Sequence, residues 1–465
     1  MKLLFISLLL YLFEYNYVQC QTCSATQECT NKACCSKFGN CGYGPNFCGT
    51  GCLSNCNAKA ECGQYGVQKL CPLNVCCSQY GFCGTTSDFC DISKKCQNNC
   101  GDKQLPECSN NQNNLIQVGY YASWAASRPC QTYKSINIDP RDYTHLNYAF
   151  GKISNGVMIN PDAKEENNMK QFVALKQINS NLKVLISVGG WAFNDPGPTR
   201  NEFHNIISTD ASRKRFIISV TNYLKKYQFD GIDIDYEYPA ANDRGGSPED
   251  TDNYVKLVKD MRSAFGNNYM ITIAAPASYW YLRHFKIGEM SKYIDFINVM
   301  TYDIHGTWDS DIASLGPYVK SHTNIQDITE AFKLFLRDGV NTNKLVLGLG
   351  YYGRSFTLDD PSCKKVGCKF KGPGKPGPCT KTPGVLAWFE IEDIITKNQL
   401  TPTFDQDSMS KILVWNRDQW VAYDDEETLA MRRQYAAKHC LKGKKKQRKH
   451  SYSNKHIHLV KKLSI

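Results

Sequence analysis

The 465-residue sequence predicts an α/β fold: a TIM-type (β/α)₈ barrel that follows two small disulfide-rich modules. Two observations lead to this fold class. From residue 116 to 441, short apolar strands alternate with amphipathic helical segments, which is typical of a parallel sheet buried on both faces. Of the 23 cysteines, 16 lie between residues 23 and 100, which is the density of a disulfide framework.

The amino terminus has the features of a secretory signal peptide. Lys2 precedes the apolar run LLFISLLLYLF, which is too short to span a bilayer, and polar residues follow it. Cleavage after Cys20 would remove residues 1–20 and leave 22 cysteines, an even number. No other apolar run in the sequence approaches membrane length. We therefore expect a secreted protein of the extracellular space or cell wall, without a membrane span.

The formal net charge of +11 comes mainly from the end of the chain. Residues 442–465 hold nine lysines and arginines and no acidic residue, so only +2 remains for the rest. The basic character is therefore a property of this tail and does not indicate a nucleic-acid-binding face. We expect a monomer with no nucleic acid partner.

Residues 21–57 and 60–101 form an internal repeat in which each copy contains eight cysteines. The inner cysteines have the same spacing in both copies. Each copy is too small for a hydrophobic core and needs its disulfides to fold. A disulfide knot that serves only as a spacer is the alternative interpretation, but aligned aromatic residues in modules that have no core argue against it.

The inner stretch of both repeats, CC-S-x-aromatic-G-x-C-G followed by aromatic-C, resembles the hevein-type chitin-binding module. The resemblance implies that aromatic rings stack on N-acetylglucosamine while a serine hydroxyl holds the acetamido carbonyl. Asn40 interrupts the aromatic pattern of the first module, where Tyr43 is the substitute, so we expect weaker binding there. The implied chitin-binding residues are Ser36, Phe38, Tyr43 and Phe47 in the first module and Ser78, Tyr80, Phe82 and Phe89 in the second.

The same resemblance implies a disulfide pairing of first with fourth, second with fifth, third with sixth and seventh with eighth cysteine. Residues 102–115, rich in asparagine, form a linker after the modules. The pairing of Cys108, Cys130, Cys363, Cys368, Cys379 and Cys440 stays open. The implied pairs are Cys23–Cys35, Cys29–Cys41, Cys34–Cys48, Cys52–Cys56, Cys62–Cys77, Cys71–Cys83, Cys76–Cys90 and Cys96–Cys100.

Seven candidate strands follow the linker. A helix between two of them shows clear end signals: Ser247 as the N-cap, Pro248 in the first turn, Asp250 as its capping partner and Gly266 at the end. An open doubly wound sheet is the alternative, but it would need a glycine-rich turn after the first strand, and YYASWAAS is not one. The strands are expected at residues 116–122, 144–150, 183–191, 229–237, 270–276, 295–303 and 344–353.

The fourth of these strands, FDGIDIDYE, carries acidic side chains at alternating positions. Asp233, Asp235 and Glu237 therefore share one face, about 6.5–7 Å apart along the strand. Crowded carboxyl groups in a barrel interior cannot all ionise, so one keeps its proton, as the cleavage of a glycosidic bond requires. A calcium loop is the alternative, but Tyr238 stands where such a loop needs glycine. No metal, nucleotide or flavin motif occurs, so we expect no cofactor.

The stretch DGIDIDYEYP resembles the D-x-x-D-x-D-x-E motif of family 18 glycoside hydrolases, the chitinases. SVGG (187–190), MTYD (300–303) and YYGRSF (351–356) resemble the motifs that this family carries on its third, sixth and seventh strands. The resemblance covers residues 116–441, in which residues 357–422 are similar to the family's small α+β insertion. Together with the two amino-terminal modules, it points to the fungal-type chitinases.

This resemblance implies a secreted, endo-acting chitinase that hydrolyses β-1,4-N-acetylglucosamine linkages in chitin and chito-oligosaccharides. The mechanism is retaining and uses the acetamido group of the substrate as the nucleophile. Glu237 is the implied proton donor, Asp235 orients the acetamido group, and Asp233 tunes Asp235. The other implied residues are Tyr302 on the acetamido carbonyl, Asp303 and Arg354 on hydroxyl groups, and Tyr121, Phe150 and Trp191 along the cleft.

The family pattern places an eighth strand, ending in tryptophan, after the helix EETLAMRRQYAAKHCLKG. Here the sequence continues as KKKQRKHSYSNKHIHLVKKLSI, without tryptophan or a strand period. ILVWNRDQW (412–420) precedes the helix and belongs to the insertion instead. We therefore expect seven barrel strands with two unpaired edges and a disordered tail at 442–465. The alternative function is a chitin-binding, lectin-like protein whose barrel is inactive or weakly active.

Overall fold

A computed structural model describes residues 22–108 and 115–442, which form two compact units that divide between Asp102 and Lys103. The expected signal peptide and the basic tail beyond residue 442 lie outside the described residues. No helix in these two ranges has the length and apolarity needed to span a membrane.

The first unit contains the two cysteine-rich modules, and both have the same local structure. In the first module, β1 (Cys34–Cys35) pairs with β2 (Cys41–Gly42), and α1 (Pro45–Cys48) follows. In the second, β3 (Cys76–Cys77) pairs with β4 (Cys83–Gly84), and α2 (Ser87–Cys90) follows. The eight disulfides of the unit are the eight pairs that the resemblance implies.

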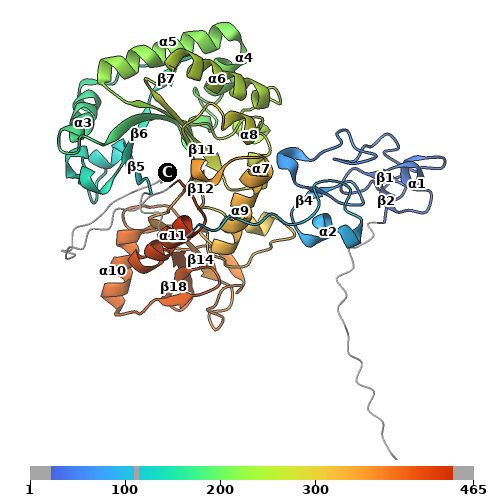
Figure 1. The fold of residues 1–465 in the computed structure, drawn as a ribbon. Helices are drawn as coiled ribbons and strands as arrows, with labels where there is room; N and C mark the ends of the chain where they lie inside the picture. The colour runs from blue at the N-terminus through green and yellow to red at the C-terminus, as the bar shows by residue number, and fades with distance from the viewer. Residues whose placement is uncertain (1–21, 109–114, 443–465) are drawn as a thin grey trace, which may run out of the picture. The chain divides into compact units, whose positions relative to one another are not determined.

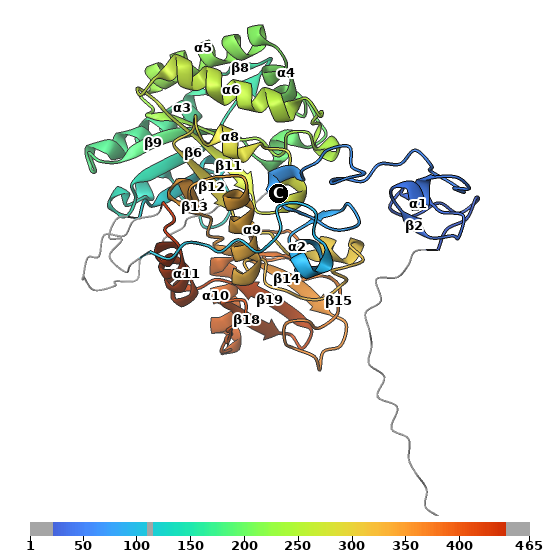
Figure 2. The ribbon, with the colours of Figure 1, turned by 45° about the vertical axis from the view of Figure 1, so that its right-hand side comes forward.

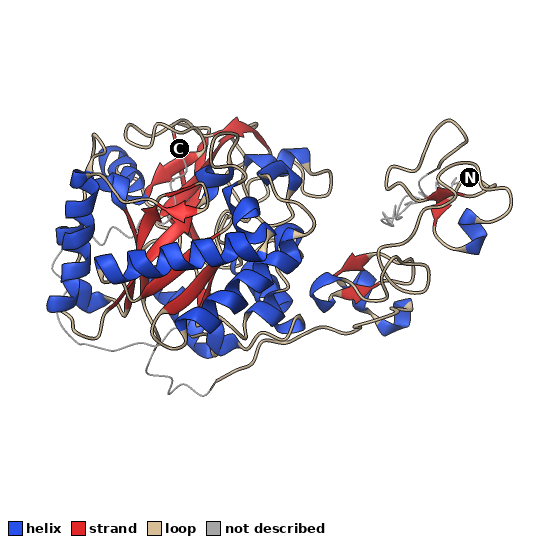
Figure 3. Ribbon diagram, turned by 90° about the horizontal axis from the view of Figure 1, so that it is seen from above, coloured by secondary structure: helices blue, strands red, loops and turns tan. Residues whose placement is uncertain are grey.

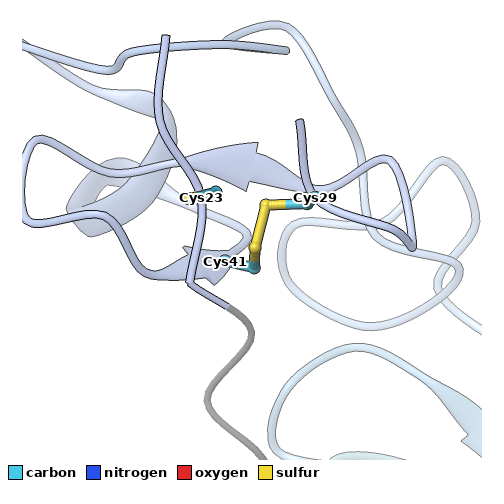
Figure 4. Close-up of side chains that lie close together, drawn as sticks. All are labelled: Cys23, Cys29 and Cys41. Carbon is cyan, nitrogen blue, oxygen red and sulfur yellow. A yellow bond between two sulfur atoms is a disulfide. The ribbon is translucent and has the colours of Figure 1, made fainter. Parts of the chain in front are cut away.

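Sulfur atoms of three cysteines lie close together in each module. Figure 4 shows this cluster in the first module, where Cys29 is bonded to Cys41 and Cys23 lies beside them. Cys23 is itself bonded to Cys35. Metal ligation by cysteine needs a thiolate, so these clusters are disulfide cores and not metal sites.

The second unit is built around a parallel seven-stranded sheet that curls into an incomplete barrel (Figures 1 and 2). Every neighbouring pair in this sheet is parallel, and β13 and β5 are its two edges within the described residues. The seven predicted strands are confirmed. In sheet order they are β13 (Leu345–Leu347), β12 (Phe296–Met300), β11 (Met270–Pro276), β10 (Gly231–Asp235), β9 (Lys183–Gly189), β6 (His145–Gly151) and β5 (Val118–Ala122).

Helices cover the outer face of this sheet, as Figure 3 shows for the longest of them. The helix predicted after the fourth strand begins two residues later than its end signals suggested. Glu249 is the N-cap, and the Ser247 amide donates to the Asp250 carboxylate at 2.8 Å instead of capping the helix with its own side chain. The helices are α3 (Ala163–Val173), α4 (Glu202–Ser208), α5 (Asp210–Tyr227), α6 (Asp250–Phe265), α7 (Tyr279–Leu282), α8 (Ile287–Met290), α9 (Ile325–Arg337) and α11 (Glu426–Lys438).

The insertion is a second, antiparallel sheet with one helix, α10 (Trp388–Asn398). It begins earlier than expected, because the YYGRSF stretch is not the end of the seventh barrel strand but most of β14, which pairs with β19. Residues 412–420 lie in the β18–β19 hairpin, as predicted for the insertion. Its strands are β14 (Tyr352–Leu358), β15 (Phe370–Pro373), β16 (Val385–Ala387), β17 (Thr403–Asp405), β18 (Ser410–Trp415) and β19 (Gln419–Tyr423); a small hairpin, β7 (Ile153–Ser154) and β8 (Val157–Met158), follows β6.

The remaining six cysteines form three disulfides within the second unit. Cys108 pairs with Cys440, Cys130 with Cys379, and Cys363 with Cys368. The first two connect the beginning of the unit to its last helix and to the insertion.

We expect the folded chain to lose stability in acid because of His145, the first residue of β6. Its ring lies edge-on to Phe296, and burial, with Lys442 and Lys183 nearby, lowers its pKa from 6.5 to about 4. Below pH 6.5 the unfolded chain therefore binds a proton that the folded chain does not, which favours unfolding. We expect this group alone to cost up to about 3 kcal/mol of stability as the pH falls from 6.5 to 4.

Thermal denaturation of the native chain and of His145→Gln across this pH range measures the effect. Because other groups also titrate, the difference between the two proteins is the informative quantity, and the variant should show the shallower pH dependence. Parallel curves for the two proteins would contradict the assignment.

Candidate active site

The carboxyl groups predicted on the fourth strand lie in the interior of the barrel. Asp233 is fully buried, and Asp235 and Glu237 are each 2% exposed. Asp233 and Asp235 belong to β10, and Glu237 follows its carboxyl end, where the active sites of such barrels lie. Side chains along this strand alternate between the two faces of the sheet. Tyr236, between two inward acids, points to the outer face and donates a hydrogen bond to Asp250 of α6 at 2.8 Å.

Asp233 is held by donors from four other strands of the sheet. One of its oxygens accepts hydrogen bonds from the hydroxyls of Tyr120 (2.9 Å) and Ser187 (2.6 Å). The other accepts from the Thr272 hydroxyl (2.6 Å) and the Asn298 amide (3.0 Å). These four residues belong to β5, β9, β11 and β12, so the carboxyl group ties the interior of the sheet together.

Burial raises the pKa of Asp233 above its ordinary value, and the neighbouring Asp235 adds to this shift. The donated hydrogen bonds from Ser187, Thr272 and Tyr120 act in the opposite direction because they stabilise the ionised form. The two carboxyl groups are thus electrostatically coupled, which is the arrangement that the sequence predicted.

Asp235 has an oxygen, Oδ1, that is buried without a hydrogen-bond partner among the described residues. A buried acceptor of this kind is costly unless a ligand pairs with it. Its main-chain carbonyl accepts from the Gly190 amide at 2.8 Å. Gly189, with φ of +101°, lies so close that a Cβ there would be 2.2 Å from the same carbonyl oxygen. The SVGG stretch therefore needs glycine in order to pack against the strand that carries the acids.

Two loops fix the backbone of Glu237. The Asn194 side chain accepts from its amide at 3.4 Å, and the Arg244 guanidinium donates to its carbonyl at 3.2 Å. Arg244 also pairs with Asp195 at 2.8 Å and donates to the carbonyl of Trp191. The acid at the mouth of the barrel is thereby held by the segments that follow β9 and β10.

Tyr302 is 4% exposed and follows β12. Burial, followed by the nearby Tyr352 and Asp235, raises its pKa well above 10. Its hydroxyl therefore stays protonated.

Asp303 and Arg354, both predicted to contact substrate, form an ion pair of 2.8 Å at the rim. Burial alone would raise the pKa of Asp303, but Arg354 and the neighbouring His322 lower it below its usual range. The carboxylate is therefore ionised. The Arg354 guanidinium also lies 4.9 Å from the ring of Trp308, which is 38% exposed.

The other predicted cleft aromatics also lie at carboxyl ends of strands. Phe150 of β6 stacks on Trp124, with ring centroids 6.1 Å apart. Trp191, after β9, lies 3.7 Å below the Arg244 guanidinium and 6.5 Å from the ring of Tyr238. Partly exposed rings thus lie at the carboxyl ends of β6 and β9, the same end of the sheet at which Glu237 follows β10.

The assignment of Tyr121 to the cleft is wrong. Its ring stacks on Phe172 of α3 at 5.5 Å, and its hydroxyl bonds Tyr133 and Asn168 at 3.3 Å, so it belongs to the layer between sheet and helices. Because adjacent residues of a strand point to opposite faces, it is Tyr120 that reaches the acids. The sequence contains both tyrosines side by side, and nothing in it favours either.

Sequence reasoning also missed Thr272 and Asn298, which bind Asp233. Both stand at alternating positions within apolar strands, and a polar side chain at an inward position is the signal that could have identified them. Among the other tryptophans, Trp388 and Trp415 pack into the insertion's core, whereas Trp280 is 60% exposed.

The serines that were predicted to bind sugar make similar hydrogen bonds to the main chain in the two modules. The Ser36 oxygen accepts from the amides of Phe38 and Asn40, and the Ser78 oxygen accepts from that of Phe82 at 3.2 Å. Phe38 is 75% and Tyr80 is 64% exposed.

The remaining predicted rings of the modules are partly buried. Phe47 and Phe89 lie in equivalent positions, each against a glycine where a Cβ would meet the ring at 2.6 Å. Tyr43, the proposed substitute, packs on the disulfide core of its module and lies 5.4 Å from the ring of Phe82.

Residues 116–444 match the glycosyl hydrolases of family 18, and residues 61–100 match the chitin recognition proteins. A protein of Penicillium expansum, described as a secreted chitinase, is 34% identical over 422 residues, which are 87% of this chain and 26% of the relative. The chain thus spans about a quarter of the length of that curated relative.

Solved structures are similar to most of the chain. The group IV chitinase of Ostrinia furnacalis, in complex with allosamidin, has a TM-score of 0.64 and 31% identity, and the match covers 71% of this chain and 91% of that one. A human protein, YKL-39, has a TM-score of 0.62 and 26% identity with the same coverage, and it is described as a pseudo-chitinase with retained chitooligosaccharide binding.

Proposed function

Because the chain belongs to the glycosyl hydrolases of family 18, we propose that it is a secreted chitinase that hydrolyses β-1,4-N-acetylglucosamine linkages of chitin. One observation supports this proposal above the others: Asp233, Asp235 and Glu237 lie on one face of β10 and after its end, and Asp233 is anchored by four other strands. A barrel that served only as a scaffold would gain nothing from burying three carboxyl groups in this way.

In the proposed reaction, Glu237 donates a proton to the glycosidic oxygen while the acetamido oxygen of the substrate attacks the anomeric carbon. Bond cleavage gives an oxazolinium ion and frees the leaving sugar. Glu237 then takes a proton from water, which opens the oxazolinium ion and restores the acid.

Asp235 accepts the acetamido N–H in this scheme, and its partnerless Oδ1 is the acceptor for it. Tyr302 donates to the acetamido oxygen, a role for which its raised pKa is suitable because the hydroxyl stays protonated. Asp233 acts on Asp235 through the electrostatic interaction between the two carboxyl groups, and it positions Asp235. Asp303, Arg354 and the rings of Phe150 and Trp191 bind the sugars on either side.

Incubation of the full chain with a soluble chito-oligosaccharide tests the proposal, with the first products followed by NMR. The mechanism predicts that the newly formed end appears first as the β-anomer, because the configuration is retained. An α-anomer as the initial product would rule out the acetamido route. Absence of cleavage, together with saturable binding of the oligosaccharide, would favour the second candidate.

The second candidate function is chitin binding without turnover. It is supported by the open edges β5 and β13, which leave the described barrel incomplete, and by the similarity to a pseudo-chitinase. The buried carboxyl groups favour the enzyme.

We also propose that both modules bind chitin and that the chain is exported. Its disulfides and the description of its Penicillium expansum relative as a secreted chitinase support the export.

We expect Tyr80→Ala to weaken binding to insoluble chitin more than the matched Phe38→Ala. Both rings are exposed, so neither change should affect folding, but Asn40 already removes one ring from the first module. Loss of one stacked ring should cost about 1 kcal/mol, roughly fivefold in affinity. Pull-down isotherms on chitin measure both variants, and equal losses would contradict the ranking of the two modules.

A further inference from the structure

A buried histidine outside the row of acids, His322, contacts the segments on both sides of the Asp303–Arg354 ion pair. Its side chain is fully buried, in the segment that precedes α9. Nδ1 of the ring lies 3.2 Å from the main-chain nitrogen of Asp303, and Nε2 lies 3.1 Å from the carbonyl oxygen of Tyr352. Tyr352 is the first residue of β14, the strand that carries Arg354. The ring thus connects the segment after β12 to the strand that holds the other partner of the pair.

The two main-chain partners determine which nitrogen of the His322 ring carries a proton. A main-chain amide only donates, and a main-chain carbonyl only accepts. Nδ1 therefore accepts from the Asp303 amide, while Nε2 carries the proton and donates to Tyr352. Nδ1 also lies 3.5 Å from the Asp303 carboxylate, which is farther than the amide. The amide of Asp303 is thus the closer partner of the ring.

Asp303 has a backbone conformation that surrounding contacts must hold. Its φ is +58°, in the left-handed region that residues other than glycine rarely adopt. The amide of Asp303 is bound by the ring of His322, and its carboxylate accepts from the Arg354 Nε at 2.8 Å. The next amide, that of Ile304, donates to the His322 carbonyl at 3.1 Å. This second contact does not involve the ring, so a substitution at residue 322 can leave it in place.

The residues on both sides of His322 are anchored to the insertion. The hydroxyl of Ser321 lies 2.7 Å from that of Ser410 in β18. The hydroxyl of Thr323 donates to the Asp424 carboxylate, after β19, at 2.8 Å. All four of these anchoring side chains are buried. The ring of His322 therefore extends from a fixed backbone, as a group that determines the position of another residue requires.

We propose that His322 is a positioning residue whose ring holds Asp303 so that its carboxylate faces Arg354 and the sugar hydroxyl groups of the cleft. The inference rests on the proposed function, in which Asp303 and Arg354 bind the sugars. His322 acts through Asp303 and does not touch the substrate, because its side chain is fully buried and both ring nitrogens are bound to the main chain.

Two substitutions separate the two hydrogen bonds of the ring. In His322→Asn the side-chain oxygen lies near the position of Nδ1 and can accept from the Asp303 amide, but no group reaches Tyr352. In His322→Gln the amide nitrogen reaches the position of Nε2 and can donate to Tyr352, but Asp303 loses its acceptor. Each variant keeps one hydrogen bond, so the two should unfold at similar temperatures and differ mainly at Asp303.

Initial rates of chito-oligosaccharide cleavage by the full chain measure the effect on the site. We expect His322→Gln to lower kcat/KM by ~10-fold, mainly through a higher KM, because Asp303 binds the sugar both before and during bond cleavage. His322→Asn should stay within about threefold of the native chain. His439→Gln, the same chemical change at a partly exposed position after α11, is the control and should keep native rates.

A double-mutant cycle shows whether His322 acts through Asp303. Asp303→Asn keeps the main-chain amide but replaces the carboxylate that the ring is proposed to orient. If His322 serves that carboxylate, adding His322→Gln to Asp303→Asn should lower kcat/KM by less than about threefold, in place of the ~10-fold loss in the native background. Both variants should therefore be measured alone and together, with their unfolding temperatures.

Hydrogen exchange of residues 301–308 at increasing oligosaccharide concentration gives the same comparison without turnover. His322→Gln should need ~10-fold more sugar for half-maximal protection of this segment, and His322→Asn about the native concentration. A native chain with neither cleavage nor sugar-dependent protection here would overturn the proposed function and the positioning role together. Losses that are equal in His322→Gln and His322→Asn, or fully additive in the cycle, would overturn the positioning role alone.

Discussion

Glu237→Gln is expected to lower chito-oligosaccharide turnover by ~10²–10⁴-fold, the contribution that is typical of a general acid. The amide keeps the shape of the side chain but has no proton to give to the leaving oxygen. Asn194 and Arg244 hydrogen-bond to the backbone of residue 237, and these two contacts do not depend on its carboxyl group.

A matched control is Glu249→Gln, which makes the same chemical change at an exposed position before α6. It should retain native turnover. Both variants should bind insoluble chitin like the native chain, since the two modules are untouched. Turnover of Glu237→Gln within a few-fold of the control would remove Glu237 from the mechanism.

Asp233→Ala is expected to be the most destabilising single substitution in the barrel interior. It would leave four buried donors, on Tyr120, Ser187, Thr272 and Asn298, without their acceptor. Each such donor costs about 1–3 kcal/mol, and with partial rearrangement we expect a total on the order of 3–5 kcal/mol. The midpoint of thermal unfolding of the full chain measures this loss.

Asp233→Asn separates the loss of acceptors from the loss of charge. An amide oxygen can still accept from Thr272 and Asn298, and the hydroxyls of Tyr120 and Ser187 can turn to accept from the amide nitrogen. This variant should therefore recover at least half of the stability that alanine loses. An alanine variant as stable as the native chain would show that the four donors find other partners.

The sequence was sufficient for features that follow from periodicity. The alternation in GIDID predicted that Asp233 and Asp235 point inward, and apolar runs of strand length predicted all seven strands. It was insufficient where two neighbours compete for one face, as with Tyr120 and Tyr121, since both are large, aromatic and able to donate a hydrogen bond. Packing on Phe172 decides that question, and this contact joins residues far apart in the chain.

The six isolated cysteines show the same limit. Within the modules a repeated spacing identified the pairs through their resemblance to a known framework, but six unrelated cysteines allow 15 connectivities. The pair Cys108–Cys440 is 332 residues apart and forms because the segment before β5 runs beside the end of α11, where the Cys108 amide donates to the carbonyl of Lys438 at 2.8 Å. Only the tertiary fold brings these segments together.

The long-range disulfides also determine what happens when a protease cuts the second unit. Cys108–Cys440 and Cys130–Cys379 span nearly the whole unit, so a single cut between residues 130 and 344 leaves two fragments joined by both bonds. Each fragment holds part of the parallel sheet, and covalent linkage keeps them at a high effective concentration. A nicked chain should therefore migrate as one band on a denaturing gel without reductant and as two bands with it. Outside the cell, such damage would leave the molecule in one piece for as long as its surroundings stay oxidising.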